Sequence, residues 1–192
     1  MCVIVHNWFN KQFNKEEMQH FYELNNDGTG LYYYNMNTGK VTIKKWPRET
    51  TFNEIWQTLN SLYKHKQIRN VAVHFRYSTS GGEGERQIHP MKMSNGMYLM
   101  HNGVLPAFEF DTRIMSDTQV MAFWLDNVFD KKNIKDLSDI SFEFSQELEN
   151  VFQYNKVLLL HKQCFRILNQ NLGEWRNDIW YSCKSYYNSD ID

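Results

Sequence analysis

Three hairpin signals constrain the fold of this chain more than any other feature of its sequence. In each case two short runs rich in β-branched or aromatic residues flank a turn: NTG within 30–46, SNG within 91–103, and HKQ between 156–160 and 164–168. A tight hairpin joins neighbouring strands that run in opposite directions. The sheets of this protein are therefore predicted to be mainly antiparallel.

The other segments divide into short strands and amphipathic helices. The runs CVIV at 2–5, NVAVHFRYS at 70–78 and IWYS at 179–182 predict strands. Apolar residues at helical spacing predict a helix within 50–66, capping and acidic residues predict helices at 14–24 and 116–129, and 141–152 is a further candidate. The sequence therefore predicts an α+β domain with sheets covered by helices. Periodicity does not fix the number of layers.

Length and composition favour one well-packed domain over residues 1–192. Hydrophobic residues make up 42% and aromatic residues 16% of the chain, which suits a buried core. A net charge of -1 gives no broad basic field for nucleic acid. The longest aliphatic run, VLLL, is far too short to span a membrane, no secretory signal is visible, and three widely spaced cysteines do not suggest a disulfide framework. We expect a soluble, cytoplasmic protein that binds neither nucleic acid nor membrane.

Five places carry polar groups that a simple core would not need. They are Cys2, NNDGTG at 25–30, HFRYSTSGG at 74–82, LMHNG at 99–103, and Asp117. Each has an ordinary interpretation when taken alone. Such a cysteine can be a small buried residue, a lone arginine at a strand end a solvated charge, Asn-Gly a turn, and an aspartate at a helix start a cap.

In their order along the chain, however, these stretches resemble the motifs of class II glutamine amidotransferase domains, which are N-terminal nucleophile hydrolases, and above all the stand-alone members. The matching elements are Met1-Cys2, N-x-D-G-x-G at 25–30, R-[WY]-[AS]-T-x-G at 76–81, His89-Pro90, His101-Asn102-Gly103, Ser116-Asp117-Thr118 and a terminal W…YS region. The resemblance runs from residue 2 to about 187. It implies a four-layer α-β-β-α sandwich with two mainly antiparallel sheets.

The resemblance also implies a mechanism. Cys2, freed by removal of Met1, would attack the side-chain carboxamide of glutamine, form a γ-glutamyl thioester and release ammonia. Its own α-amine, with a pKa of about 7.7–8.0, would take the thiol proton, by way of a water in the family scheme. The Asn102 side-chain amide and the Gly103 N–H would stabilise the oxyanion. Glycine at 103 would leave room for the thioester centre.

The same resemblance assigns the residues that hold free glutamine. Arg76 would grip the α-carboxylate, Asp117 would hold the α-ammonium, and Thr79 would add a hydroxyl contact. The chain departs from the family in two places. Ser80 stands where many members have histidine, and no arginine occurs near Leu24, where synthase-type members carry one. The second departure supports the stand-alone subgroup.

No metal or other cofactor is expected, because His6, His74, His89 and His101 show no tight ligand spacing. His89 and His101 are expected to brace the loops of the site. The expected substrate is a small molecule, and with no room for a synthase domain, ammonia would be released or passed to a separate protein. Two alternatives stay open at this point: hydrolysis of a γ-glutamyl amide on a larger molecule, and a catalytically silent glutamine-binding regulatory module of the same fold.

Overall fold

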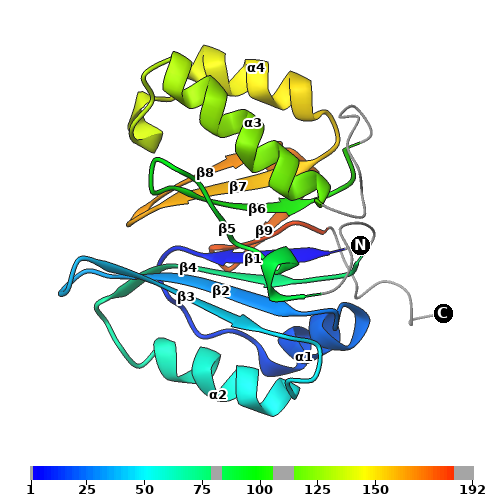
Figure 1. Cartoon of the computed structure of the whole chain (residues 1–192). Helices are drawn as coiled ribbons and strands as arrows, with labels where there is room; N and C mark the ends of the chain where they lie inside the picture. Colours follow the sequence, from blue (N-terminus) through cyan, green and yellow to red (C-terminus); the bar gives the residue numbers. More distant parts are fainter. Residues whose placement is uncertain (1, 79–83, 106–114, 184–192) are drawn as a thin grey trace.

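The computed structural model describes residues 2–78, 84–105 and 115–183, so the predicted site residue Thr79 lies outside the described residues. The described residues form four layers: two helices, a six-stranded sheet, a four-stranded sheet, and two more helices (Figure 1). All strand pairs in both sheets are antiparallel. The predicted α+β fold and its four-layer arrangement are therefore confirmed.

The larger sheet carries the predicted nucleophile at the end of a central strand. Its order is β3 (Lys40–Trp46), β2 (Thr29–Asn35), β4 (Ile68–Phe75), β1 (Val3–Asn7), β10 (Ile179–Tyr181) and β9 (Glu174–Arg176). Helices α1 (Lys15–Leu24) and α2 (Phe52–Leu62) cover its outer face. The core under these helices includes Val3, Val5, Phe21, Ile55 and Phe75, all essentially buried. Removing their apolar surface from water is the main force holding this half together.

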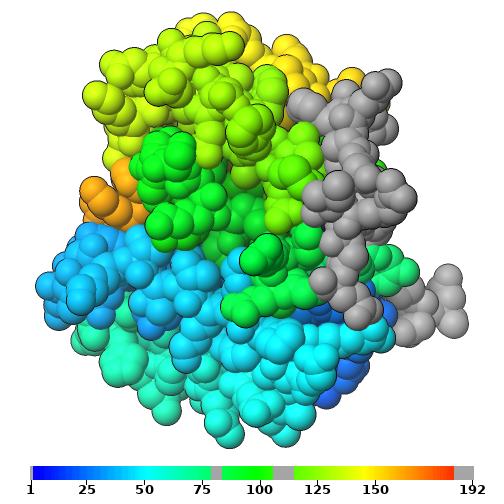
Figure 2. All heavy atoms as spheres, in the orientation of Figure 1, coloured from blue at the N-terminus to red at the C-terminus, as the bar shows by residue number. Residues whose placement is uncertain are grey.

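The smaller sheet is built around the last two predicted hairpins. Its order is β5 (Met91–Lys92), β6 (Tyr98–Asn102), β7 (Lys156–His161) and β8 (Cys164–Leu168). Helices α3 (Asp117–Lys131) and α4 (Phe142–Phe152) cover its outer face. Figure 2 shows the green segment around β5 packing against both halves of the molecule on this face.

A third apolar cluster lies between the two sheets and explains the run VIV in β1. Val3 and Val5 face the helices, whereas Ile4 packs with Tyr32, Met100 and other residues of both sheets. Successive side chains of a strand point to opposite faces, so a strand that is buried on both faces needs an uninterrupted apolar run. β1 is therefore held on both faces as well as along both edges.

The helix starts follow the predicted capping chemistry. The side chains of Asn14, Ser116 and Ser141 accept hydrogen bonds from backbone N–H groups in the first turns of α1, α3 and α4. Ser116 is the cap, and Asp117 is the first residue of the helix.

One strand of the larger sheet was not predicted. β9 pairs with β10 through a two-residue turn at Asn177 and Asp178, with φ values of 51° and 62°. Two successive residues with positive φ are typical of a type I′ hairpin turn, which Asn and Asp tolerate better than most residues. Three short 3-10 segments, at 85–87, 137–139 and 170–172, were also not predicted. None of the helices in the described ranges is long and apolar enough to cross a bilayer.

Candidate active site

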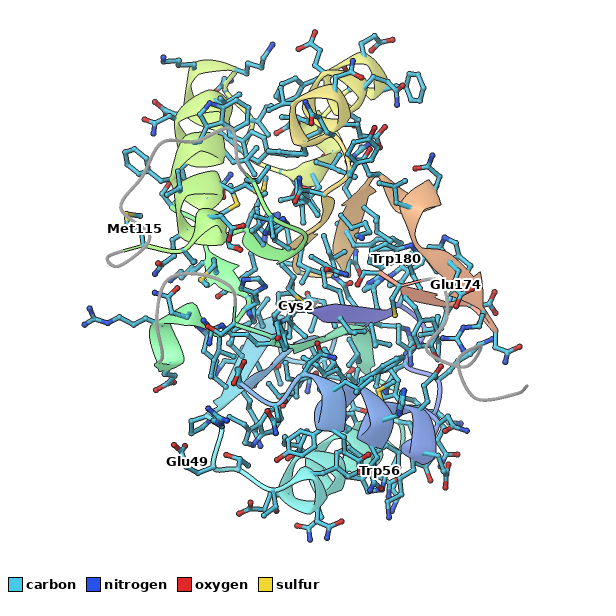
Figure 3. The ribbon with its side chains drawn as sticks, turned by 90° about the vertical axis from the view of Figure 1, so that its right-hand side faces the viewer. Cys2, Glu49, Trp56, Met115, Glu174 and Trp180 are labelled. Carbon is cyan, nitrogen blue, oxygen red and sulfur yellow. The ribbon has the colours of Figure 1, made fainter. Side chains whose placement is uncertain are left out.

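Cys2 lies where β1 meets the end of β4. The register pairs Val3 with Phe75, which places Cys2 beside the residues that follow β4. The Cys2 Sγ is 3.3 Å from the Tyr77 backbone nitrogen, which donates to it, and 3.4 Å from the Tyr77 carbonyl oxygen, to which the thiol can donate. Figure 3 shows Cys2 near the middle of the molecule, between the upper and lower pairs of helices.

The surroundings of Cys2 favour the thiol over the thiolate. Burial raises the pKa of Cys2 above its ordinary value, and the Asp117 carboxylate raises it further. The Tyr77 hydrogen bond, the chain N-terminus and the Arg76 guanidinium lower the pKa, but burial outweighs them. The nitrogen of Cys2 is in a peptide bond with Met1 in this chain, so it carries no basic lone pair. The mechanism that the resemblance implies would depend on the amine that Met1 removal would expose.

Arg76 is buried at the end of β4 and is positioned by the glycine-rich turn at 25–30. The Arg76 backbone N–H donates to the Gly28 carbonyl at 2.9 Å, and the Asp27 N–H donates to the Arg76 carbonyl at 3.0 Å. The guanidinium donates to the Ser78 hydroxyl at 3.0 Å. The Asp27 carboxylate in turn accepts from the Ser78 backbone N–H at 2.8 Å. The N-x-D-G-x-G segment at 25–30 therefore holds the end of β4 that carries Arg76.

Glycine is required in this turn by close packing. A Cβ at Gly30 would lie 1.5 Å from the His89 carbonyl oxygen, and one at Gly28 would lie 2.7 Å from the Ile88 side chain. Gly28 also has φ +135°, which side-chain-bearing residues rarely adopt. The glycines of the 25–30 motif thus allow the turn to pack against the His-Pro segment.

Asn102 is the last residue of β6, and Gly103 follows it directly. The Asn102 carboxamide donates from Nδ2 to the Ser182 hydroxyl at 2.8 Å and to the Ser182 carbonyl at 3.3 Å. Gly103 has φ +151°, and a Cβ there would lie 2.0 Å from the Asn155 Oδ1. Packing against Asn155 therefore requires glycine at 103, which is a reason that the sequence argument did not contain.

Asp117 lies in the first turn of α3 and lines the pocket that also contains Cys2 and Arg76. Its carboxylate accepts from the Leu105 backbone N–H at 3.2 Å and from the Thr118 backbone N–H at 2.8 Å. His101 lies behind it, with Nδ1 3.9 Å from the Asp117 carboxylate and 3.0 Å from the Thr118 hydroxyl. The other ring nitrogen of His101 is 2.8 Å from the Asn155 Oδ1.

Three buried histidines lie beside the site, and burial keeps them neutral. His74 and His89 stack with ring centroids 4.0 Å apart, and the His101 backbone N–H donates to the His89 Nδ1 at 3.3 Å. Burial lowers the pKa of His74 to about 3 and also lowers the pKa values of His89 and His101. Among the residues that the structure describes, no group of three or more His, Cys, Asp or Glu side chains could hold a metal ion.

These contacts bring most of the predicted residues to one pocket. Its lining consists of Cys2, Arg76, Tyr77, Gln87, His89, His101, Gly103, Ser116, Asp117 and Thr118. The Asn102 side chain contacts Ser182 instead. Sequence reasoning did not single out Gln87, Asn155 or Ser182. Asn155 contacts His101 across 54 positions of sequence and Ser182 contacts Asn102 across 80, so no local pattern assigns either contact.

Comparison with known proteins gives matches only at the level of structure. No family model matches the sequence, and neither does any curated protein. One similar solved structure is the glutamine phosphoribosylpyrophosphate amidotransferase from B. subtilis complexed with ADP and GMP, with a TM-score of 0.52 and 17% identity. A second, described as the allosteric regulatory enzyme of purine biosynthesis, has a TM-score of 0.55 and 18% identity.

In both cases the match covers 94% of this chain but 41% of the other chain. This chain therefore spans less than half the length of the proteins it resembles. At these identities the likeness shows the fold, and this chain has the N-terminal nucleophile hydrolase-like fold of those structures.

Proposed function

We propose that this protein hydrolyses the side-chain amide of glutamine through a thioester on Cys2. The observation that carries the proposal is the meeting of a cysteine thiol, a buried guanidinium and a carboxylate in one pocket. A guanidinium suits the α-carboxylate of an amino acid, and a carboxylate suits its α-ammonium. The fold likeness to glutamine amidotransferases supports the same reaction class.

In the proposed reaction the Cys2 Sγ attacks the carboxamide carbon while the amine of the processed N-terminus takes the thiol proton. The Asn102 amide and the Gly103 N–H stabilise the oxyanion, a contribution worth roughly 10²–10³ in rate per donor. The C–N bond of the carboxamide then breaks. Its nitrogen takes the proton held by the N-terminal amine and leaves as ammonia. Water cleaves the thioester to glutamate and restores the thiol.

We further propose that residues 1–192 form a single glutamine amidotransferase type-2-like domain that acts in the cytoplasm without a cofactor. Ammonia is then released or passed to a separate protein. Arg76, Asp117 and Thr79 hold the amino-acid end of the substrate. A γ-glutamyl amide on a larger molecule keeps the same contacts and is the closest alternative substrate.

Two observations favour a second candidate, a catalytically silent glutamine-binding regulatory module. The pKa of Cys2 is raised, and the Asn102 amide donates to Ser182 and not into the pocket. Such a module would bind glutamine with Arg76 and Asp117 and release no ammonia. Ammonia release therefore separates the two candidates directly.

The decisive experiment treats the purified protein with a glutamine-mimicking diazo-ketone and measures intact mass. The proposal expects loss of Met1, one adduct that maps to Cys2, and ammonia release from glutamine that Cys2→Ala abolishes. Cys164→Ala is the matched control, because Cys164 is an exposed thiol on β8, outside the pocket. Retention of Met1 in an active preparation, or full activity in Cys2→Ala, would refute the mechanism. Asparagine and γ-glutamyl amides in the same ammonia assay define the substrate.

A further inference from the structure

Asn155 is buried immediately before β7, and its carboxamide has one defined orientation. Its Nδ2 donates to the Phe152 carbonyl at 2.8 Å, and its Oδ1 is 2.8 Å from the His101 Nε2. A backbone carbonyl can only accept, so the amide nitrogen belongs on the Phe152 side and the amide oxygen faces His101. A Cβ at Gly103 would lie 2.0 Å from this same oxygen, so the contact packs directly against Gly103.

The Asn155 oxygen determines which ring nitrogen of His101 carries the hydrogen. An amide oxygen has no hydrogen to donate, so the contact at Nε2 is a hydrogen bond only when Nε2 is the donor. A neutral histidine carries one ring hydrogen, and the hydrogen bond at one nitrogen sets the state of the other. Neutral His101 therefore has its hydrogen on Nε2 and a lone pair on Nδ1.

The ionisable groups around His101 support the neutral ring. Burial lowers the pKa of His101 below its ordinary value, and the Lys156 ammonium on β7 lowers it further, whereas the Asp117 carboxylate on α3 raises it. Burial outweighs the carboxylate. The other two ionisable neighbours, His74 on β4 and His89, are themselves kept neutral by burial. Asp117 is therefore the only one of these four groups that favours a charged His101.

The lone pair on the His101 Nδ1 in turn directs the Thr118 hydroxyl. The Thr118 Oγ1 lies 3.0 Å from the His101 Nδ1 and 3.4 Å from the Asp117 Oδ1, so two acceptors compete for one hydrogen. The shorter distance favours His101. The Asp117 carboxylate accepts from two backbone N–H groups, and a carboxylate offers about four acceptor positions. Capacity for a ligand therefore remains on a side chain that lines the pocket.

We propose that Asn155 is a positioning residue that keeps the Asp117 carboxylate available to the α-ammonium of the substrate. It acts through the hydrogen positions on His101 and Thr118. With a hydrogen on Nδ1, His101 would donate to the Thr118 Oγ1, and the Thr118 hydroxyl would turn to donate to Asp117. That hydrogen would occupy an acceptor position that the ammonium needs. This inference rests on the proposed role of Asp117 in holding glutamine and adds the residue that sets its state.

A carboxylate at position 155 should reverse the arrangement. In Asn155→Asp a negative charge lies beside the His101 Nε2 and favours the protonated ring, which carries a hydrogen on both nitrogens. The Nδ1 hydrogen then displaces the Thr118 hydrogen toward Asp117. The positive charge on the ring also lies 3.9 Å from the Asp117 carboxylate and competes with the substrate ammonium. Affinity should fall only for ligands that carry an ammonium.

Two ligands that differ only in the ammonium test this role. Glutamine carries it, whereas glutaramate has the same carboxylate and carboxamide without it. Isothermal titration calorimetry at pH 7 in a Cys2→Ala background measures both dissociation constants without turnover. We expect Asn155→Asp to raise Kd for glutamine roughly 10-fold, equivalent to about 1.4 kcal/mol, and to change Kd for glutaramate less than about twofold.

NMR of the histidine rings gives a readout that a loss of packing would not move. Long-range ¹H–¹⁵N spectra should show the His101 hydrogen on Nε2 alone in the wild type and on Nδ1 as well in Asn155→Asp. Asn127→Asp is the matched control, because it makes the same chemical change at an exposed amide of α3. It should leave both dissociation constants and the His101 signals unchanged.

Each result decides the matter. An unchanged Kd for glutamine, an equal loss for both ligands, or unchanged His101 signals in Asn155→Asp overturns the positioning role. Glutamine binding without ammonia release by the processed wild type overturns the proposed hydrolysis and leaves this role standing, whereas a chain that does not bind glutamine overturns both. If Asn155→Asp does not fold, Asn155→Leu removes the acceptor without adding a charge, and the same two ligands and the same spectra judge it, with the hydrogen expected on Nδ1.

Discussion

Lowering the pH from 7.5 to 5.0 should destabilise this protein through histidines that are buried in their neutral form. His6 and His74 are fully buried. Burial lowers the pKa of His6 from 6.5 to about 4 and that of His74 from 6.5 to about 3. Both histidines therefore stay neutral in the folded state at pH 5.0, whereas an unfolded histidine binds a proton below about pH 6.5. Proton uptake thus favours the unfolded state as the pH falls.

The magnitude follows from the linkage of protonation to unfolding. At pH 5.0, protonation stabilises an unfolded histidine with a pKa of about 6.5 by roughly 2 kcal/mol, and at pH 7.5 by almost nothing. The folded-state pKa values of His6 and His74 lie at least about one unit below pH 5.0, so the folded protein recovers little of this. The two residues together should remove about 4 kcal/mol of stability, out of a typical 5–15 kcal/mol.

Urea unfolding at pH 7.5 and pH 5.0, followed by tryptophan fluorescence, measures this difference. The matched variant is His74→Phe, because phenylalanine removes the titrating ring nitrogens and keeps a planar ring in the same fully buried place. Its loss of stability between the two pH values should be smaller than that of the wild type by about 2 kcal/mol. Equal losses in the two proteins, or no loss in the wild type, would show that the reasoning about His74 is wrong.

Three further predictions concern the pocket and the turn beside it. Replacing Arg76 with Lys removes the planar guanidinium that can form two parallel hydrogen bonds to a carboxylate. Ammonia-release kinetics should then show KM for glutamine raised by roughly tenfold or more, with a smaller effect on kcat. A change in kcat alone would contradict the binding role. In the chain that keeps Met1, the rate of Cys2 alkylation by iodoacetamide, followed by peptide mass mapping, should rise with pH. The midpoint of this rise should lie above pH 9.0, because burial raises the pKa of the Cys2 thiol. A midpoint below pH 8 would contradict this. Gly30→Ala should destabilise the fold by several kcal/mol because its Cβ would overlap the His89 carbonyl oxygen, and a midpoint of thermal unfolding within about 2 °C of wild type would refute that packing argument.

Much of the fold could be predicted from the sequence because its signals are local. Turn residues between β-rich runs predicted the hairpins, and capping residues predicted the starts of α1 and α3. β9 was missed because Glu174, Trp175 and Arg176 form a three-residue edge strand with no apolar alternation. Only its partner β10 and the Asn177-Asp178 turn define it.

The candidate site was predictable only as far as its motifs are contiguous. The ordered stretches around Cys2, Arg76, Asn102 and Asp117 carried the resemblance, and the structure brings Cys2, Arg76 and Asp117 to one pocket. Their roles in catalysis stay predictions. The contact of Ser182 with Asn102 joins residues 80 positions apart; both lie in matched motifs, but the motifs do not indicate that the two residues touch.

The place of β1 in the larger sheet has a consequence for the order of events during synthesis. β1 is made first, yet its neighbours are β4, which follows some sixty residues later, and β10, whose following residue, Ser182, contacts Ile4 of β1 across 178 positions of sequence. A growing chain leaves the ribosome from its N-terminus, so β4 becomes available to β1 well before β10, which ends at Tyr181. One edge of β1 therefore stays unpaired until nearly all of the described strands have been made. The larger sheet is complete only when β10 pairs with β1.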